Sequence, residues 1–305
     1  MELTLPTPAD SAAVAELVLA LEVSLYGKSA FSQADLEDEW SGLDIERDAR
    51  VVRDGDRVVG YGVVRERGER WRVEGYVHPD ALGRGIGSLI ATALEEDAAR
   101  GGARRVQNGV LEADSAAREL LEALGYTAVR VFREMRIELD GPPPAPEWPD
   151  GLHVVPFDPE RDAREFHAAN EEAFADAWGH TPRDFESWSK VAFESERFDP
   201  TLWCVVRAGD EIAAGTICTG DTYGGGFVHD LFTRRPWRKR GVGAALLADA
   251  FGRFWERGER SVGLGVDAAS ETGAFRLYER AGMAPALGWV AYEKELGLDR
   301  VDQAR

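Results

Sequence analysis

The sequence predicts an α/β protein built from two tandem domains, each a mixed, mostly antiparallel sheet flanked by helices. The second half of the chain carries strand and helix patterns in the order β-α-α-β-β-β-α-β-α-β, which indicates a mixed sheet covered by helices. The first half repeats this layout about 150 residues earlier, a period too long for a solenoid repeat. A chain of 305 residues with 44% hydrophobic side chains can bury two cores of this size.

The elements of the second half follow one another in a clear order. Leu152 to Phe157 alternates as a strand, and Pro159 to Ala177 has helical spacing. A second helix is expected after Thr181-Pro182, and then a hairpin that turns at Gly209-Asp210. The hairpin strands are expected over 202–208 and 212–218, followed by a strand over 227–233, a helix ending near 258, a strand over 262–266, a helix over 274–281 and a closing strand over 289–296.

Paired segments in the two halves indicate a duplicated domain. The pairs are Leu82–Gly87 with Arg238–Gly243, Ala117–Gly125 with Ala274–Gly282, Asp54–Asp56 with Gly209-Asp210, and Thr7-Pro8 with Asp158-Pro159. A proline-rich linker over 141–150 separates the copies. We therefore expect a first domain over 1–140 and a second over 151–305.

Composition excludes several classes of function. The net charge of −19 argues against nucleic-acid binding, and the five histidines show no metal-ligand spacing, so we expect no metal. Cys204 and Cys218 both fall in expected strands, where burial explains them. No apolar run approaches the length of about 20 residues that a membrane span needs, and the N-terminus lacks a signal-peptide pattern. We expect a cytoplasmic protein without a membrane partner.

The segment Arg238–Gly243 is typical of a turn that holds a pyrophosphate. Glycines at alternate positions let the main chain approach a phosphate and turn its N–H groups toward it, and the following helix adds its positive N-terminal end. The flanking arginines supply countercharge. Two glycines in a strand-to-helix turn are weak evidence alone, because sterics often require them.

A second segment, Gly273–Met283, adds the missing specificity. Together the two segments resemble the signature regions of the GNAT superfamily of acyl-CoA-dependent N-acetyltransferases: Arg, two residues, Gly, one residue, Gly, and later an Ala-x-x-Leu-Tyr helix that ends in Gly. The resemblance implies that Arg238, Gly241 and Gly243 belong to the pyrophosphate site of coenzyme A. It also implies that Tyr278 protonates the departing thiolate.

The resemblance implies further contacts with acetyl-CoA. In the family, the strand before the glycine turn and the strand after its helix splay apart, and the pantetheine arm lies between them, paired here with the backbone of Leu231 and Thr233. Ser270 stands where many relatives carry a coenzyme-contacting Asn, although a helix cap is an equal explanation. The full set of expected coenzyme contacts is Leu231, Phe232, Thr233, Arg238, Lys239, Arg240, Gly241, Val242, Gly243, Ala244, Ser270 and Ala274.

The general base is harder to assign than the acid. His229 and Asp230 precede the glycine turn on one strand, and alternation points them to opposite faces unless a bulge intervenes. His229 has the better intrinsic pKa and is favoured, with a water chain or Asp267 as rivals. Asp230 has Glu74 at the equivalent place in the first copy, which favours a shared structural role.

The first copy is degenerate at the catalytic positions. Leu82 replaces Arg238 and Leu121 replaces Tyr278, while the glycines are kept. We expect catalysis in the second copy only. A second, structural coenzyme site in the first copy would use Val77, Gly83, Arg84, Gly85, Ile86, Gly87 and Ser88.

The expected function is acetyl transfer from acetyl-CoA to the primary amine of a small molecule, by direct transfer within a ternary complex, in a monomer or homodimer. Residues 170–200, with Trp178 and His180, look like the acceptor-side helices of actinobacterial tandem GNAT proteins, the group that includes mycothiol synthase. Mycothiol synthesis is therefore a specific alternative. A non-catalytic acyl-CoA sensor is an alternative of another class, which retention of Tyr278 disfavours because a sensor needs no proton donor.

Overall fold

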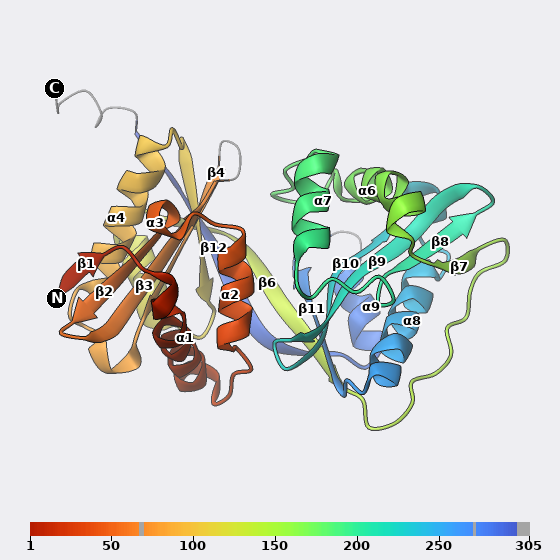
Figure 1. The fold of residues 1–305 in the computed structure, drawn as a ribbon, viewed down its shortest axis with the longest axis horizontal. Helices are drawn as coiled ribbons and strands as arrows, with labels where there is room; N and C mark the ends of the chain where they lie inside the picture. The colour runs from red at the N-terminus through yellow and green to blue at the C-terminus, as the bar shows by residue number, and fades with distance from the viewer. Residues whose placement is uncertain (67–69, 271–272, 298–305) are drawn as a thin grey trace. The chain divides into compact units, whose positions relative to one another are not determined.

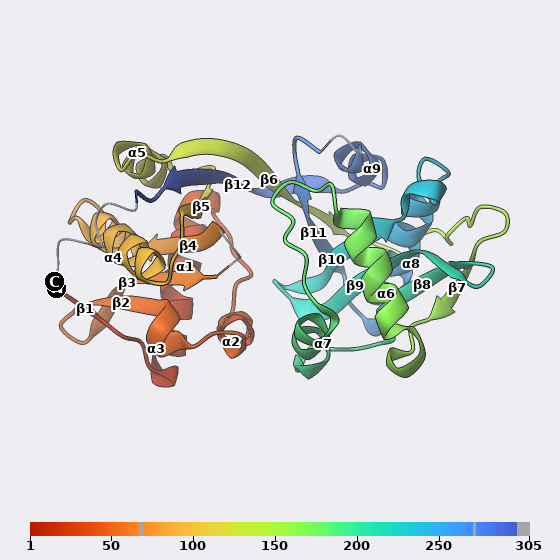
Figure 2. The same ribbon diagram turned by 90° about the horizontal axis from the view of Figure 1, so that it is seen from above.

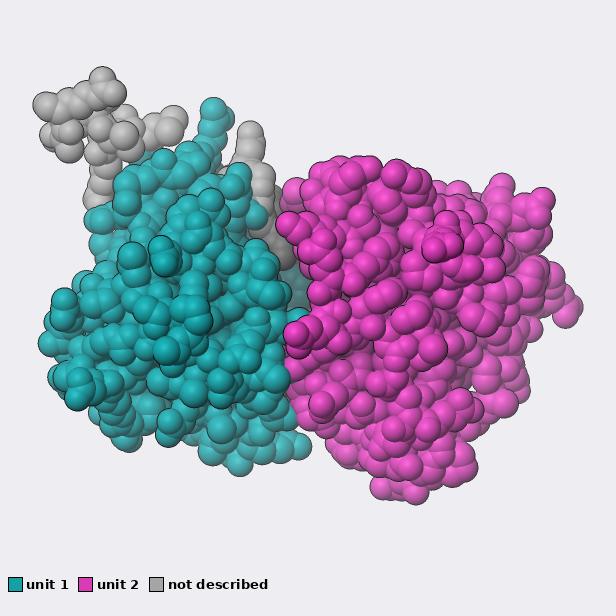
Figure 3. All heavy atoms as spheres, in the orientation of Figure 1, with its two compact units in different colours: residues 1–132, 287–305 teal, residues 133–286 magenta. Residues whose placement is uncertain are grey.

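The chain forms two compact units, which Figure 3 colours separately. A computed structural model describes residues 1–66, 70–270 and 273–297. Unit 1 comprises residues 1–132 and 287–305, and unit 2 comprises residues 133–286.

Unit 1 is a mixed sheet with helices on both faces (Figures 1 and 2). Its strands lie in the order β1-β2-β3-β4-β5-β12, where β12 is the closing strand Ala284–Glu295, and the β4–β5 pair is parallel. Its strands are β1 (Glu2–Thr4), β2 (Ala49–Asp54), β3 (Arg57–Arg65), β4 (Arg70–Val77) and β5 (Arg105–Leu111), and its helices are α1 (Ser11–Tyr26), α2 (Gln33–Ser41), α3 (Ile45–Asp48), α4 (Ile86–Arg100) and α5 (Ser115–Ala123), with short 3-10 turns η1 (Pro8–Asp10) and η2 (Pro79–Ala81).

Unit 2 has the same plan, with strand order β6-β11-β10-β9-β8-β7, where β6 is Thr127–Glu138, and a parallel β10–β11 pair. Its elements are β7 (His153–Pro156), α6 (Pro159–Phe174), α7 (Phe185–Glu194), β8 (Cys204–Ala208), β9 (Glu211–Thr222), β10 (Gly225–Thr233), η3 (Arg235–Trp237), α8 (Val242–Arg257), β11 (Ser261–Asp267) and α9 (Ala274–Arg280). Every element expected for the second half is present, and the mixed-sheet fold class is confirmed.

Helices α6 and α8 cover opposite faces of the unit 2 sheet (Figure 1). A Cβ added to Gly215 on β9 would lie 2.5 Å from the ring of Phe166 on α6, and one added to Gly226 on β10 would lie 2.4 Å from Phe254 on α8. Both helices therefore pack so closely on the strands that only glycine fits beneath them. This contact fixes the two helices against the site described below.

The domain boundaries differ from the expected ones because the two halves exchange a strand. The long strand β6 (Thr127–Glu138) leaves unit 1 at Phe132 and contributes Met135 to the core of unit 2. In return, β12 (Ala284–Glu295) pairs with β5 of unit 1, from Trp289 opposite Leu111 to Glu295 opposite Arg105. The closing strand thus belongs to unit 1, and the expected domains 1–140 and 151–305 are not the compact units. The segment 141–150 has neither helix nor strand, as expected of a linker, but lies within unit 2.

The described residues bear on two expectations, that the chain has no membrane span and that it has no metal site. Among the helices of the described residues, none has the length and hydrophobicity to cross a bilayer. The same residues contain no cluster of three or more His, Cys, Asp or Glu side chains placed to hold a metal ion. Cys204 and Cys218 are buried free thiols, and burial raises the pKa of Cys218 to about 12.

Candidate active site

The turn before α8 has the backbone shape of an anion-binding turn. Gly241 is the N-cap residue with φ +89°, and no atom lies within 4 Å of a Cβ placed on it. Lys239 is also left-handed, with φ 59°. The first N–H groups of a helix have no intrahelical acceptor, so this turn presents donors beside open space.

Gly243 serves a different purpose from Gly241. A Cβ on Gly243 would lie 3.0 Å from Leu277 of α9, so this glycine lets α9 pack directly on the start of α8. The contact brings the helix that carries Tyr278 beside the glycine turn. The two sequence segments that predicted the site are therefore adjacent in space, and helix packing explains the second glycine.

Arg238 does not direct its side chain into the turn. Its Nε donates to the Thr233 carbonyl at 2.9 Å, and its Nη2 donates to the Ala173 carbonyl at 2.8 Å. Ala173 lies in the last turn of α6, where carbonyls lack helical partners. The guanidinium therefore ties α6 to the end of β10, and the geometry gives no support for the expected countercharge role of this side chain.

We predict that Arg238→Ala changes the free energy of unfolding more than it changes the free energy of coenzyme A binding. Loss of two charge-assisted hydrogen bonds should reduce the free energy of unfolding by about 1 to 3 kcal/mol. Urea unfolding measures this change, and Lys239→Ala is the control because Lys239 is exposed. Unchanged stability with much weaker coenzyme A binding would show instead that the guanidinium acts on the ligand.

Lys239 and Arg240 are the cations available to an anion at this turn. Both side chains are exposed, and within the described part of the chain neither forms a hydrogen bond or an ion pair. A phosphate held by the turn would lie within reach of these long side chains. Countercharge is thus present, but on the two residues that follow Arg238.

Strands β10 and β11 separate as they approach the turn. Their parallel pairing covers only Gly226–Val228 opposite Val262–Leu264, although β10 continues to Thr233 and β11 to Asp267. Beyond this pairing, Leu231 and Thr233 have no partner strand on the β11 side among the described residues. The expected splay is observed, although the Thr233 carbonyl already accepts the Arg238 bond.

A β-bulge at His229 places both candidate bases on one face of the sheet. Val228 pairs with Cys218 and Asp230 pairs with Ile217, so His229 is the extra residue. The centroids of the His229 and Phe227 rings lie 5.0 Å apart, whereas Asp230 accepts a hydrogen bond from Asn170 of α6. In unit 1 the β3–β4 pairing has no such shift. Val73, the residue at the position of His229 in that copy, therefore keeps its alternation and lies in the core beneath α4.

Asp230 and Tyr278 lie close enough to interact, while His229 is directed elsewhere. Burial, and then the negative charge of Asp230, raise the pKa of Tyr278 to about 12. Tyr278 is 7% exposed and packs in the unit 2 core. His229 is exposed, and its Nε2 lies 2.7 Å from Thr219 Oγ1. The geometry therefore favours Asp230 over His229 as the group that acts with Tyr278.

The remaining expected site residues have mixed roles. Ser270 is not a helix cap, because α9 begins at Ala274 with Gly273 as its N-cap. Asp267 accepts a bond from the Ala269 N–H at 2.9 Å within the turn after β11. Phe232 and Val242 are core residues with 2% and 1% exposure, so they can offer a ligand only main-chain groups. Ala244 is exposed on the first turn of α8.

Unit 1 keeps the turn but not the surrounding chemistry. Gly83 and Gly85 are left-handed, with φ 72° and 79°, and Gly87 packs against Leu120 as Gly243 packs against Leu277. Arg84 forms an ion pair with Asp54 at 2.8 Å, and Leu121 is buried at the position of Tyr278. Of the other expected contacts, Ile86 is buried in the core, Val77 is half-buried and Ser88 is exposed. The anion-binding backbone is thus retained without a proton donor.

Sequence reasoning missed Asn170. This residue is 6% exposed on α6, and its Nδ2 donates to Asp230 Oδ2 at 2.9 Å. Its place on the buried face of an amphipathic helix, among apolar neighbours, was the available signal. His180, an expected acceptor contact, bonds to Glu171 on the same helix at 3.0 Å.

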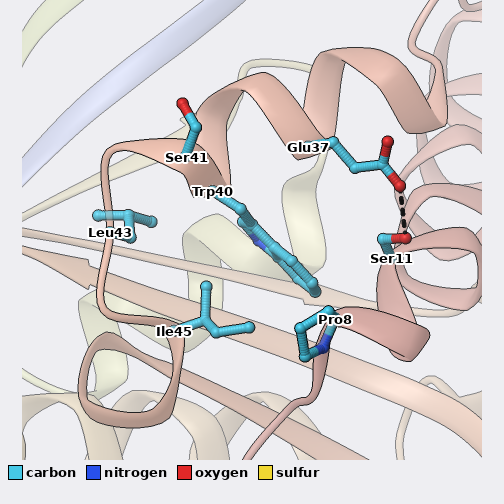
Figure 4. Close-up of a pocket in the computed structure, with 7 residues that line it drawn as sticks. All are labelled: Pro8, Ser11, Glu37, Trp40, Ser41, Leu43 and Ile45. Carbon is cyan, nitrogen blue, oxygen red and sulfur yellow. Dashed lines mark hydrogen bonds between the residues drawn. The ribbon is translucent and has the colours of Figure 1, made fainter. Parts of the chain in front are cut away.

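Unit 1 also has a pocket whose lining includes no residue of its glycine turn (Figure 4). It is formed by η1, α1, α2 and α3 and has Trp40 as its largest side chain, with Ser11 donating to Glu37 at 2.8 Å across one side. Its lining residues are Pro8, Ser11, Glu37, Trp40, Ser41, Leu43 and Ile45. None of these belongs to the expected second coenzyme site.

Comparison with known families decides the identity of the fold. Residues 17–126 and 163–283 both match the family described as acetyltransferase (GNAT). The chain belongs to this family. It is a tandem GNAT protein, and hence an acetyl-CoA-dependent N-acetyltransferase.

Relatives of this GNAT protein cover most of its length. A mycothiol acetyltransferase from Thermobispora bispora is 33% identical over an alignment of 245 residues that covers 76% of this chain and 78% of the relative. A solved GCN5-related N-acetyltransferase from Sphaerobacter thermophilus is 36% identical with a TM-score of 0.85, covering 96% of this chain and 95% of that one. A tandem GNAT protein from the clavulanic acid pathway has a TM-score of 0.75 at 19% identity, covering 97% and 98%, which shows the shared fold alone.

The residues of unit 2 fit acetyl-CoA. The open left-handed Gly241 leaves space for a phosphate, the start of α8 supplies donors, and Lys239 and Arg240 supply positive charge. The separated edges of β10 and β11 leave main-chain groups for amide pairing. The open glycine turn, the exposed cations and the separated strand edges of this tandem GNAT protein thus occur together in unit 2.

Proposed function

We propose that unit 2 acetylates the primary amine of a small molecule, with Asp230 as the base and Tyr278 as the acid. Two observations support this assignment: Tyr278 lies on the helix that packs against Gly243, and it lies within reach of the Asp230 charge. An acceptor amine is cationic at neutral pH, so a carboxylate at the site would attract it as well as deprotonate it.

The proposed chemistry divides the proton transfers between the two residues. Bound acetyl-CoA supplies an activated acetyl group as a thioester. Asp230 takes a proton from the acceptor ammonium, which frees the nitrogen lone pair to form the new N–C bond. Tyr278 gives its phenolic proton to the sulfur as the C–S bond breaks, and is reprotonated from water. The second ammonium proton leaves to solvent once the N–C bond has formed, and the third stays on nitrogen as the amide hydrogen. Asp230 returns its proton to solvent, so each turnover releases one proton, and charge and atoms balance.

An amine panel tests the proposal. Release of coenzyme A thiol from acetyl-CoA, measured with a chromogenic thiol reagent, should depend on the acceptor. Asp230→Asn should abolish most of that dependence while coenzyme A binding persists. Acceptor-independent release, or none with any amine while coenzyme A binds at micromolar concentration, would support a sensor instead.

The glycine turn should determine coenzyme affinity. We predict that Gly241→Ala weakens coenzyme A binding by about 10-fold or more, because the methyl group enters the space reserved for a phosphate and a left-handed alanine is strained. Calorimetry measures the affinity. Gly85→Ala in unit 1 has the same strain and the same empty surroundings, so it is the matched control.

The same titration tests a second coenzyme site in unit 1. Two sites per chain, one of them lost in Gly85→Ala, would support the site expected at Val77 and residues 83–88. One site per chain would overturn it. We expect this second site to bind coenzyme A more weakly than the unit 2 site, because Arg84 already forms an ion pair with Asp54.

A more specific acceptor follows from the relatives. Their names describe mycothiol acetyltransferases, so we propose the amine of a cysteinyl pseudodisaccharide as the acceptor to test first. Because that acceptor carries a thiol, loss of thioester ultraviolet absorbance is the suitable measurement. No turnover at saturating acetyl-CoA would exclude this acceptor. A cytoplasmic location and a monomeric or homodimeric state also stay predictions.

A further inference from the structure

The carboxylate of Asp230 has an unusual environment for a half-buried charge. Its Oδ2 accepts one hydrogen bond, from the neutral amide of Asn170 at 2.9 Å. Across the described ranges 1–66, 70–270 and 273–297, no arginine, lysine or histidine forms an ion pair with it. Its negative charge is therefore held in place without being neutralised.

Unit 1 shows what a neutralised version of this position looks like. Glu74 lies the same number of residues before its left-handed glycine as Asp230 does. Arg72 Nε lies 2.6 Å from Glu74 Oε1 and Arg65 Nη1 lies 3.1 Å from Oε2. Although burial alone would raise it, these two arginines hold the pKa of Glu74 below its usual value. The charge of Glu74 is thus neutralised within an internal ion cluster, and it offers no net attraction to a cationic ligand.

The packing of α6 fixes Asn170 over Asp230. One helical turn earlier, Phe166 is fully buried and meets Phe232 of β10 edge-to-face at 5.0 Å. Asn170 and Asp230 repeat this helix-to-strand contact one step along, since Asp230 and Phe232 are alternate residues on the same strand. Arg238 also ties the end of α6 to Thr233. The amide is thus held by a rigid helix, with 6% of the residue exposed.

Resting on the proposed role of Asp230, we propose that Asn170 is a positioning residue for acetyl transfer. Its amide fixes one carboxylate oxygen of Asp230 and leaves the charge and the second oxygen for the acceptor ammonium. A neutral donor suits this task, because an arginine would cancel the charge, as in unit 1, and a second carboxylate would repel it. The negative charge of Asp230 acts on two titratable groups, Tyr278 of α9 and Cys218 of β9, and both are neutral near pH 7.

The experiment follows the Asp230 carboxyl directly, in the full-length protein. Carbon-13 NMR titration gives its midpoint, with the resonance assigned by its loss in Asp230→Asn. In Asn170→Asp the like charge should move the midpoint up by about one pH unit or more, and Asn170→Ala should move it up by less. Asn108→Asp in unit 1, at a residue that is also 6% exposed, is the control and should leave it unchanged.

Kinetics with an acceptor from the amine panel provide the second measurement. Asn170→Ala should lower kcat/KM by about 10- to 100-fold, the effect of losing a hydrogen bond to a charged group, while coenzyme A affinity barely changes. If Asn170→Asp does not fold, Asn170→Ala and the shorter donor of Asn170→Ser provide both measurements. An unmoved midpoint together with unchanged kcat/KM would overturn the role of Asn170.

The two levels of the proposal fail in different ways. Full activity of Asp230→Asn would remove Asp230 from the reaction, and with it the proposed function as written. Loss of activity in Asp230→Asn, with Asn170 variants that behave as the parent protein does, would overturn only the positioning role.

Discussion

Tyr278→Phe should lower kcat by about 10²- to 10⁴-fold and leave coenzyme A affinity almost unchanged. The substitution removes only the hydroxyl, and the ring stays packed in the unit 2 core, where Tyr278 is 7% exposed. A loss confined to kcat therefore reports the proton donor and not the fold. Steady-state kinetics with calorimetric binding separates the two, and an unaltered kcat would remove Tyr278 from the mechanism.

The pH dependence gives an independent check on Tyr278. An acid must hold its proton, and burial together with Asp230 raises the pKa of Tyr278 to about 12. The kcat plateau should therefore extend through about pH 10, where an ordinary tyrosine would be half deprotonated. A decline of kcat centred near pH 10, absent in Tyr278→Phe, would show that the phenol titrates normally and would contradict the buried environment.

The isolated fragment 1–140 should not fold as a stable monomer. It lacks β12, whose Val290 and Tyr292 are 6% and 0% exposed in the unit 1 core. Two such side chains contribute about 3 to 6 kcal/mol together, a large part of the 5 to 15 kcal/mol that typically stabilises a domain. The missing strand also exposes β5 as an unpaired edge, which favours aggregation.

Coexpression provides the matched control for this fragment. Fragments 1–140 and 141–305 together contain every strand, so they should associate as a one-to-one complex that elutes as one species in gel filtration. Far-ultraviolet circular dichroism and urea unfolding of each fragment alone complete the test. A cooperative, monomeric unfolding transition of 1–140 alone would show that unit 1 does not depend on β12.

Local sequence determined the elements and the place of the glycine turn. Hydrophobic periodicity and turn residues located each strand and helix of the second half, and the glycines at 241 and 243 located the turn, because these signals depend only on neighbouring residues. The duplication showed that one copy lacked the tyrosine. The family could be inferred from two short segments because their signals also depend only on neighbouring residues.

Tertiary structure alone determined the strand exchange and the partners of each site residue. Nothing in the sequence of β12 distinguishes pairing with β5 from pairing within its own half, since both edges accept the same alternating pattern. The bulge that moves His229 out of the α8 core, and the meeting of Asn170 with Asp230, depend on contacts between residues far apart in the chain. The sequence by itself determined what the elements are and where the glycine turn lies. Packing determined that Arg238 ties α6 to β10 and that Asn170 meets Asp230, because a side chain's direction is set by neighbours that only folding brings together.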